Sequence, residues 1–71
     1  MAMNWKRVSD GLPPQDATVL IVFIRREETE VRLAIYKDMG QGTPWFVYGH
    51  HQDWYPSAAV THWMPLPELP A

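Results

Sequence analysis

The chain of 71 residues is long enough for a single domain covering 1–71, and it carries a net charge of −2 with no cysteine. The absence of cysteine excludes disulfides and thiolate metal sites as stabilisers of a small core. The few basic residues are dispersed, which argues against nucleic acid as a partner, and no apolar run reaches the ~18–20 residues that cross a bilayer. With no secretory signal at its start, we expect a cytoplasmic protein.

The aromatic content is high for such a short chain, with four tryptophans, three tyrosines and two phenylalanines. Each buried aromatic side chain removes roughly 150–250 Å² from water, and a core of this size does not hold all of them. We therefore expect at least one tryptophan at the surface. Because exposed Trp and Tyr are enriched at protein contact sites, the composition favours a surface that binds another molecule.

The first elements are a short edge strand and a central strand. Residues 5–8 predict the edge strand, followed by a turn at 9–11. Residues 17–24 form a continuous run of mostly β-branched side chains bounded by prolines and charges. Apolar residues fall on both faces of this run, which predicts a central strand covered on two sides. Another subunit is a candidate for one of these covers.

The next run predicts the partner strand of a hairpin. Residues 30–37 alternate, with Val31, Leu33 and Ile35 on one face and more polar side chains on the other. This alternation is the period of a half-buried strand. The charged residues between the two runs, 25–29, are few enough for a hairpin turn, although they lack Asn-Gly or Asp-Gly.

Two further strands are expected after a glycine-rich loop at 38–44. Residues 45–48 predict the third strand, 49–57 a polar and aromatic loop, and 58–63 the fourth strand, with at most one helical turn near Ser57. The predicted fold is mainly β, or a small α+β fold, with a single antiparallel sheet of about four strands, a short N-terminal strand or turn, and a proline-rich C-terminal tail packed on the sheet. In that tail, Met64, Leu66 and Leu69 are expected to cover the sheet, with a polyproline ligand as the alternative.

An aromatic group around the glycine loops is the candidate site. Trp and Tyr dominate the energetic centres of protein interfaces, so this group predicts a protein-binding surface. Core packing is the alternative, above all for the first tryptophan of the group. The candidate partner-binding residues are Trp45, Tyr48, His50, His51, Trp54 and Tyr55.

A metal site is the competing interpretation of the histidines. The candidate ligands are His50, His51, Asp53 and His62, but His-His-x-Asp is not a standard zinc spacing. If Val60 points inward, His62 shares its face and is better explained as a packed histidine. We therefore predict no cofactor.

Catalytic arrangements are equally weak. Ser9-Asp10 is typical of a turn, and the glutamates near residue 28 lie at a predicted hairpin tip, where solvent keeps their acidities alike. The chain is therefore not expected to be an enzyme.

The two ends of the chain carry a family resemblance. It opens on W-x-x-V-x-D-x-L-P between Trp5 and Pro13 and closes on T-H-W-M-P-L-P between Thr61 and Pro67. These motifs, with the strand at 19–22, resemble a family of small phage and prophage proteins classed as a domain of unknown function. The resemblance implies the bacterial cytoplasm during infection or lysogeny and a small β-rich fold, and it supplies no catalytic residues.

These observations lead to three functional hypotheses. The first is a non-catalytic phage accessory protein that binds a host or phage protein and inhibits or redirects a host defence system, such as a CRISPR or restriction complex. The second is a metal-binding protein or metal-dependent enzyme that uses the histidine cluster. The third is a homo-oligomer, for example a homodimer, whose interface uses the aromatic surplus without a separate partner.

Overall fold

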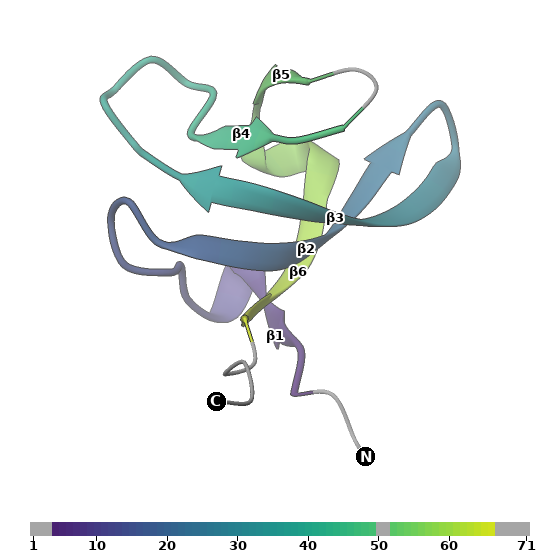
Figure 1. Cartoon of the computed structure of the whole chain (residues 1–71), viewed down its shortest axis with the longest axis horizontal. Coiled ribbons are helices and arrows are strands. Elements are labelled where there is room, and N and C mark those ends of the chain that lie inside the picture. Colours follow the sequence, from purple (N-terminus) through teal and green to yellow (C-terminus); the bar gives the residue numbers. More distant parts are fainter. Residues whose placement is uncertain (1–3, 50–51, 67–71) are drawn as a thin grey trace, which may run out of the picture.

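The computed structural model describes residues 4–49 and 52–66, which form one antiparallel sheet with two short 3-10 turns (Figure 1). The sheet has the strand order β1-β6-β2-β3-β4-β5. The elements are β1 (Lys6–Arg7), η1 (Val8–Asp10), β2 (Thr18–Arg25), β3 (Glu28–Tyr36), β4 (Trp45–Val47), β5 (Asp53–Tyr55), η2 (Ser57–Ala59) and β6 (Val60–Pro65).

The prediction of a mainly β fold with a single antiparallel sheet is confirmed, but the number of strands was too low. The sheet has six strands instead of about four. Of the two additional strands, β1 is the short N-terminal strand that was predicted separately. β5 was missed because its three residues were assigned to a loop. The single turn expected near Ser57 is present as η2.

The predicted β2–β3 hairpin is present, and its two strands are the longest of the sheet. Its strands pair from Thr18 opposite Ile35 to Arg25 opposite Glu28. Only Arg26 and Glu27 connect them, with φ angles of 51° and 68°. A two-residue loop with two positive φ values is the type I′ geometry that follows the twist of the strands. Neither residue is a glycine, so the turn costs conformational energy.

The core lies on one face of the sheet, which bends around it. Tyr55 on β5 places its ring 4.7 Å from that of Phe23 on β2, although β3 and β4 lie between these strands in the sheet. Trp45 is completely buried, and its ring lies 4.9 Å from that of Tyr36. The buried hydrophobic residues that form the core, among those described, are Val19, Ile21, Phe23, Ala34, Tyr36, Trp45, Val47, Val60 and Trp63.

The burial of β3 is the reverse of what its alternation indicated. Ala34 is fully buried and Tyr36 is buried, whereas Val31 is 58% exposed and Leu33 39% exposed. The reason lies in the neighbouring strands: Ala34 lies opposite Val19 on β2 and is therefore on the core face. The most apolar face of β3 consequently points away from the core.

A β-bulge in β6 corrects the expectation for His62. Phe23 pairs with Val60 and Val22 with His62, so one step along β2 matches two steps along β6. The extra residue is Thr61, and it changes the face on which the following side chains lie. Val60 is buried in the core, whereas His62 lies on the opposite face beside Val22.

The predicted packing of the proline-rich C-terminal tail on the sheet can be compared with the structure only up to Leu66. Pro65 pairs with Val19 as the last residue of β6, and the next residue, Leu66, is exposed. The remaining residues of the predicted tail, including Leu69, lie outside the described residues.

Candidate interaction surface

The sheet presents a second apolar face, opposite the core, which we call the open face. Directly paired residues of antiparallel strands share a face. The pairs Leu20–Leu33 and Val22–Val31 therefore extend across β2 and β3, and Met64 on β6 lies opposite Leu20. The open face consists of Leu20, Val22, Ile24, Val31, Leu33, Ile35, Phe46, Tyr48, Trp54, His62 and Met64.

Three rings occupy one end of the open face, and we call them the aromatic corner. Phe46 on β4 lies between the other two, with its ring 5.2 Å from that of Tyr48 and 5.2 Å from that of Trp54. Both contacts are edge-to-face, the geometry that aromatic pairs prefer. The register fixes the arrangement, because Ile35 pairs with Phe46 and Phe46 with Trp54. Trp54 remains 36% exposed at the edge of the sheet.

The open face is hollowed beside the aromatic corner. The hollow has a volume of about 330 Å³, open to solvent, and its lining residues are Asp16, Ile35, Lys37, Phe46 and Trp54. Its floor and one wall are therefore apolar. Its polar side is an ion pair in which Lys37 Nζ lies 3.7 Å from Asp16 Oδ1. Both charged side chains are well exposed, so the pair contributes little stability and remains available for other contacts.

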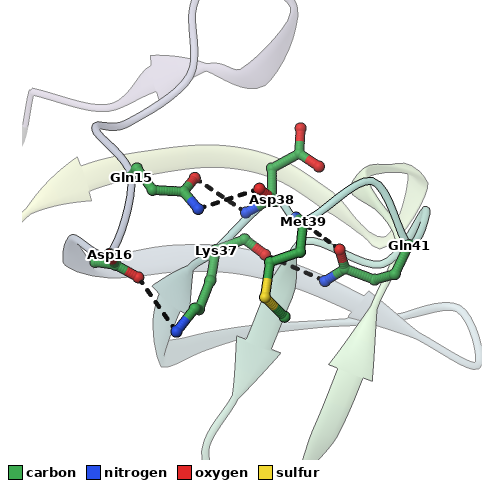
Figure 2. A network of polar contacts seen from close by, with 6 residues as sticks. All are labelled: Gln15, Asp16, Lys37, Asp38, Met39 and Gln41. Atoms are coloured by element: carbon green, nitrogen blue, oxygen red, sulfur yellow. Dashed lines mark hydrogen bonds and ion pairs between the residues drawn. The ribbon is translucent and has the colours of Figure 1, made fainter.

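Two segments that flank this hollow are tied together by polar contacts (Figure 2). Gln15 Nε2 donates to the carbonyl of Asp38 at 3.1 Å, and the N–H of Asp38 donates back to Gln15 Oε1 at 3.1 Å. The two contacts hold the residue before Asp16 against the residue after Lys37. The network therefore fixes the positions from which the ion pair extends toward the hollow.

The glycine-rich loop after β3 is closed by its own side chains. Gln41 accepts a hydrogen bond from the N–H of Met39 at 2.7 Å (Figure 2), and its Nε2 donates to the carbonyls of Lys37 and Thr43 at 3.2 and 2.9 Å. Asp38 Oδ1 accepts from the N–H of Gly40 at 3.0 Å. These bonds close the loop beyond the point where the pairing of β3 with β4 ends, so the loop is ordered without a core of its own.

The structure separates the predicted site residues. Tyr48 and Trp54 belong to the aromatic corner. Trp45 is buried on the other face, where its Nε1 donates to Ser57 Oγ at 3.0 Å, so it is a core residue and cannot contact a partner. Tyr55 packs on Phe23 toward the core. His50 and His51 lie outside the described residues.

The candidate metal ligands that lie within the described residues, Asp53 and His62, are also separated from each other. Asp53 pairs with Val47 and therefore lies on the core face, where its Oδ1 accepts from the N–H of Trp54 at 2.8 Å. His62 lies on the open face, with Nδ1 3.0 Å from Thr61 Oγ1. Three strands stand between β5 and β6 in the sheet. Within 4–49 and 52–66, no three His, Asp or Glu side chains are grouped closely enough to hold a metal ion.

The sequence analysis missed most of the open face. The strand at 30–37 was expected to be half-buried with Val31, Leu33 and Ile35 on one face, but this face was not proposed as part of a site, and Phe46 was not singled out. The apolar residues on both faces of the run at 17–24 did indicate a second apolar layer, but this signal alone does not identify the residues of β3 and β4 that lie beside it. Trp54 is the residue that confirms the expected surface tryptophan.

Comparisons with known proteins complete the description. Among the described residues, none of the helical segments has the length and apolarity needed to span a membrane. Searches of curated proteins and of solved structures found no match. A family model described as protein of unknown function (DUF551) matches residues 4–71, almost the whole chain. The expected membership in a small family of unknown function is thereby confirmed, and the chain belongs to the DUF551 family.

Proposed function

We propose that the protein is a non-catalytic interaction module that binds another protein through its open face. The observation that supports this is the exposure of Val31, Leu33 and Trp54 on one continuous apolar face. Contiguous apolar patches on small monomers mark interaction sites. The side chains of this face are aliphatic or aromatic with a single histidine, a chemistry that supplies contact area more than acid, base or nucleophile.

The aromatic corner and its hollow are the proposed centre of the contact. Rings held by edge-to-face contacts lose little conformational freedom on binding, which is why Trp and Tyr are enriched at the energetic centres of interfaces. The hollow of about 330 Å³ beside Phe46 and Trp54 has room for a large apolar side chain of a partner. Asp16 and Lys37 at its edge offer one charge of each sign to polar groups around that side chain.

The proposed setting is the bacterial cytoplasm, with a host or phage protein as partner. This part of the proposal is supported by the resemblance of the opening and closing motifs to small phage and prophage proteins. Phage proteins of this size often block or redirect a host machine, and a defence complex such as a CRISPR or restriction system is the proposed target. Inhibition by contact requires no catalytic group, which agrees with the composition of the open face.

Capture from bacterial lysate tests the binding proposal. Wild-type protein, Trp54→Ala and Leu12→Ala are immobilised at equal density, and retained proteins are identified by mass spectrometry. Leu12 is a matched control because it is an apolar residue, 49% exposed, in the loop before β2 and outside the open face. We expect the wild type and Leu12→Ala to retain the same partner and Trp54→Ala to lose it. Equal retention by all three proteins would contradict the assignment of the face.

Phage plating tests the proposed target separately. The protein is expressed in strains that carry a CRISPR or a restriction system, and the plating efficiency of a sensitive phage is compared with that in strains lacking the system. We expect plating to rise only where the defence is present, and Trp54→Ala to abolish the rise. Unchanged plating in every strain would remove host defence from the proposal while leaving the binding activity to be judged by capture.

A further inference from the structure

We propose that a second copy of this chain covers the open face, forming a two-layer sandwich of two sheets. The inference rests on the proposed function, since both assign the open face to protein contact, and it names the occupant when no other partner is bound. Its starting point is the reversed burial of β3. Val31 and Leu33 are exposed, whereas Glu30 and Arg32 of the same strand are only partly exposed and form an ion pair of 2.9 Å on the other face.

The layer structure of the molecule supports this occupant. Stable domains bury sheet faces between at least two layers, because a sheet with one apolar face in water lacks half of its packing. Here a single bent sheet covers its own core face, and among the described residues no segment lies over the centre of the open face, where Leu33 and Val31 remain exposed. A chain of 71 residues gains more from a second layer than a larger one, since its own core is small.

The area of the open face reaches what a dimer requires. Neighbouring strands lie ~4.8 Å apart and same-face residues along a strand ~6.8 Å apart, so each position tiles roughly 33 Å². The open face with its bordering Asp16, Thr18, Thr29 and Lys37 therefore covers about 500 Å² per copy, and two copies bury at most on the order of 1,000 Å², because the sheet bends away from this face. This value lies at the lower limit of specific interfaces. It predicts a reversible dimer that dissociates on dilution.

The charge of the face also permits contact between identical copies. The protein carries a net charge of −2, and the open face is bordered by one acid and two bases: Asp16 and Lys37 form an ion pair, and Arg7 lies beside His62, with which it pairs in the sheet. The charged residues of the β2–β3 hairpin lie at its tip, from Arg25 to Glu28, or on the core face, where Glu30 and Arg32 are found. A twofold axis that lies between the two layers, above the Leu20–Leu33 pair, therefore brings apolar side chains together at the centre, without a cluster of like charges.

Self-association has a regulatory consequence for the proposed function. The aromatic corner is part of the same face, so a copy seated on it excludes a partner from Phe46 and Trp54. Binding of a foreign partner then requires the dimer to separate. Self-association thereby protects an apolar surface while no partner is present, and partner capture is expected to weaken as the concentration of the free protein rises.

Sedimentation velocity of the untagged full chain, from low to high micromolar concentration, tests the inference. The variants are Val31→Glu and Leu33→Glu, with Leu12→Glu as the matched change of an exposed apolar residue outside the face. We expect the wild type and Leu12→Glu to form a dimer on concentration. Val31→Glu and Leu33→Glu should weaken dimerisation by at least about tenfold, because each would bury an unpaired carboxylate in the interface. Circular dichroism establishes that each variant is folded.

The outcomes separate this inference from the proposed function. A wild type that stays monomeric at every concentration, or a dimer unaffected by Val31→Glu, overturns the second copy as occupant. Val31 is exposed in the monomer, so its variant decides the matter even if Leu33→Glu fails to fold. A monomer that still captures a lysate protein through Trp54 refutes the dimer and supports the proposed function. A dimer that captures no lysate protein supports the second copy as occupant and contradicts the proposed function.

Discussion

The indole Nε1 of Trp63 donates a hydrogen bond of 2.9 Å to the carbonyl of Gly11, 52 residues earlier in the chain. Around this bond, Lys6 pairs with Trp63 in the sheet, and its ammonium lies 5.4 Å from the centre of the indole ring. The opening and closing motifs of the sequence therefore form one structural unit. Their shared role is to join the first strand to the last one, and they reach the open face through Arg7, His62 and Met64.

We expect Trp63→Phe to lower the free energy of unfolding by about 2 kcal/mol, because the Gly11 carbonyl loses its donor and the core loses part of an aromatic side chain. Urea denaturation of dilute protein measures this change. Trp54→Phe is the matched control, since Trp54 is partly exposed, and its effect should stay below about 0.5 kcal/mol. Equal losses in the two variants would contradict the role assigned to the Trp63 bond.

Ser57→Ala is expected to destabilise the fold by about 1–2 kcal/mol, since it leaves the N–H of fully buried Trp45 without its acceptor. Ser9→Ala, at an exposed position of η1, should have little effect and serves as the comparison. Thermal unfolding of both variants alongside the wild type provides the measurement. If Ser57→Ala melts with the wild type, the indole N–H does not depend on this hydroxyl.

Glu27→Gly is expected to stabilise the protein by about 0.5–1 kcal/mol. Glu27 has a φ of 68°, a conformation that costs an L-residue energy and that glycine adopts without strain. Glu28→Gly, one residue further and at the start of β3, should be destabilising because Glu28 has no positive φ to relieve and glycine loses more conformational freedom on folding. Chemical denaturation of the two variants distinguishes them by sign, and a loss of stability in Glu27→Gly would be evidence against a strained turn.

Alkaline pH is expected to destabilise the fold through Tyr36. Burial, with a smaller contribution from the Asp38 carboxylate, raises the pKa of Tyr36 above its ordinary value of 10.0. The unfolded chain therefore loses this proton before the folded one does, so stability is intact below about pH 10 and falls as the pH rises through the folded pKa. The measurement is the difference in unfolding free energy between wild type and Tyr36→Phe from neutral to alkaline pH. A difference independent of pH would contradict the shift.

The sequence predicted the hairpin and the sheet because their signals are local. The run at 17–24 is apolar and β-branched, and charges bound it on the side of the turn, so both the strand and its reversal could be recognised. β5 was not predicted because it has only three residues, Asp53–Tyr55, and begins with a charged side chain. A strand this short is defined by its neighbour β4 more than by its own pattern.

The faces of the strands were harder to predict than the strands. Alternation in β3 shows which side chains share a face, but the choice of the inner face depends on β2 and β4, which place Ala34 between Val19 and Val47. In β6, the bulge at Thr61 breaks the period of two, so His62 could not be placed from Val60. The candidate site inherited both errors: Trp54 and Tyr48 were correctly chosen, Trp45 was not, and the aliphatic part of the open face was omitted.

The position of β6 between β1 and β2 restricts when this protein can assume its shape during synthesis. The ribosome releases β1 and β2 early, but the strand that separates them is complete only after residue 65 has been made. A nascent chain can close the β2–β3 hairpin, yet the contact between its two ends must wait for the final segment. Stalled or truncated translation products that end before Val60 are therefore expected to lack the native sheet and to be substrates for proteases.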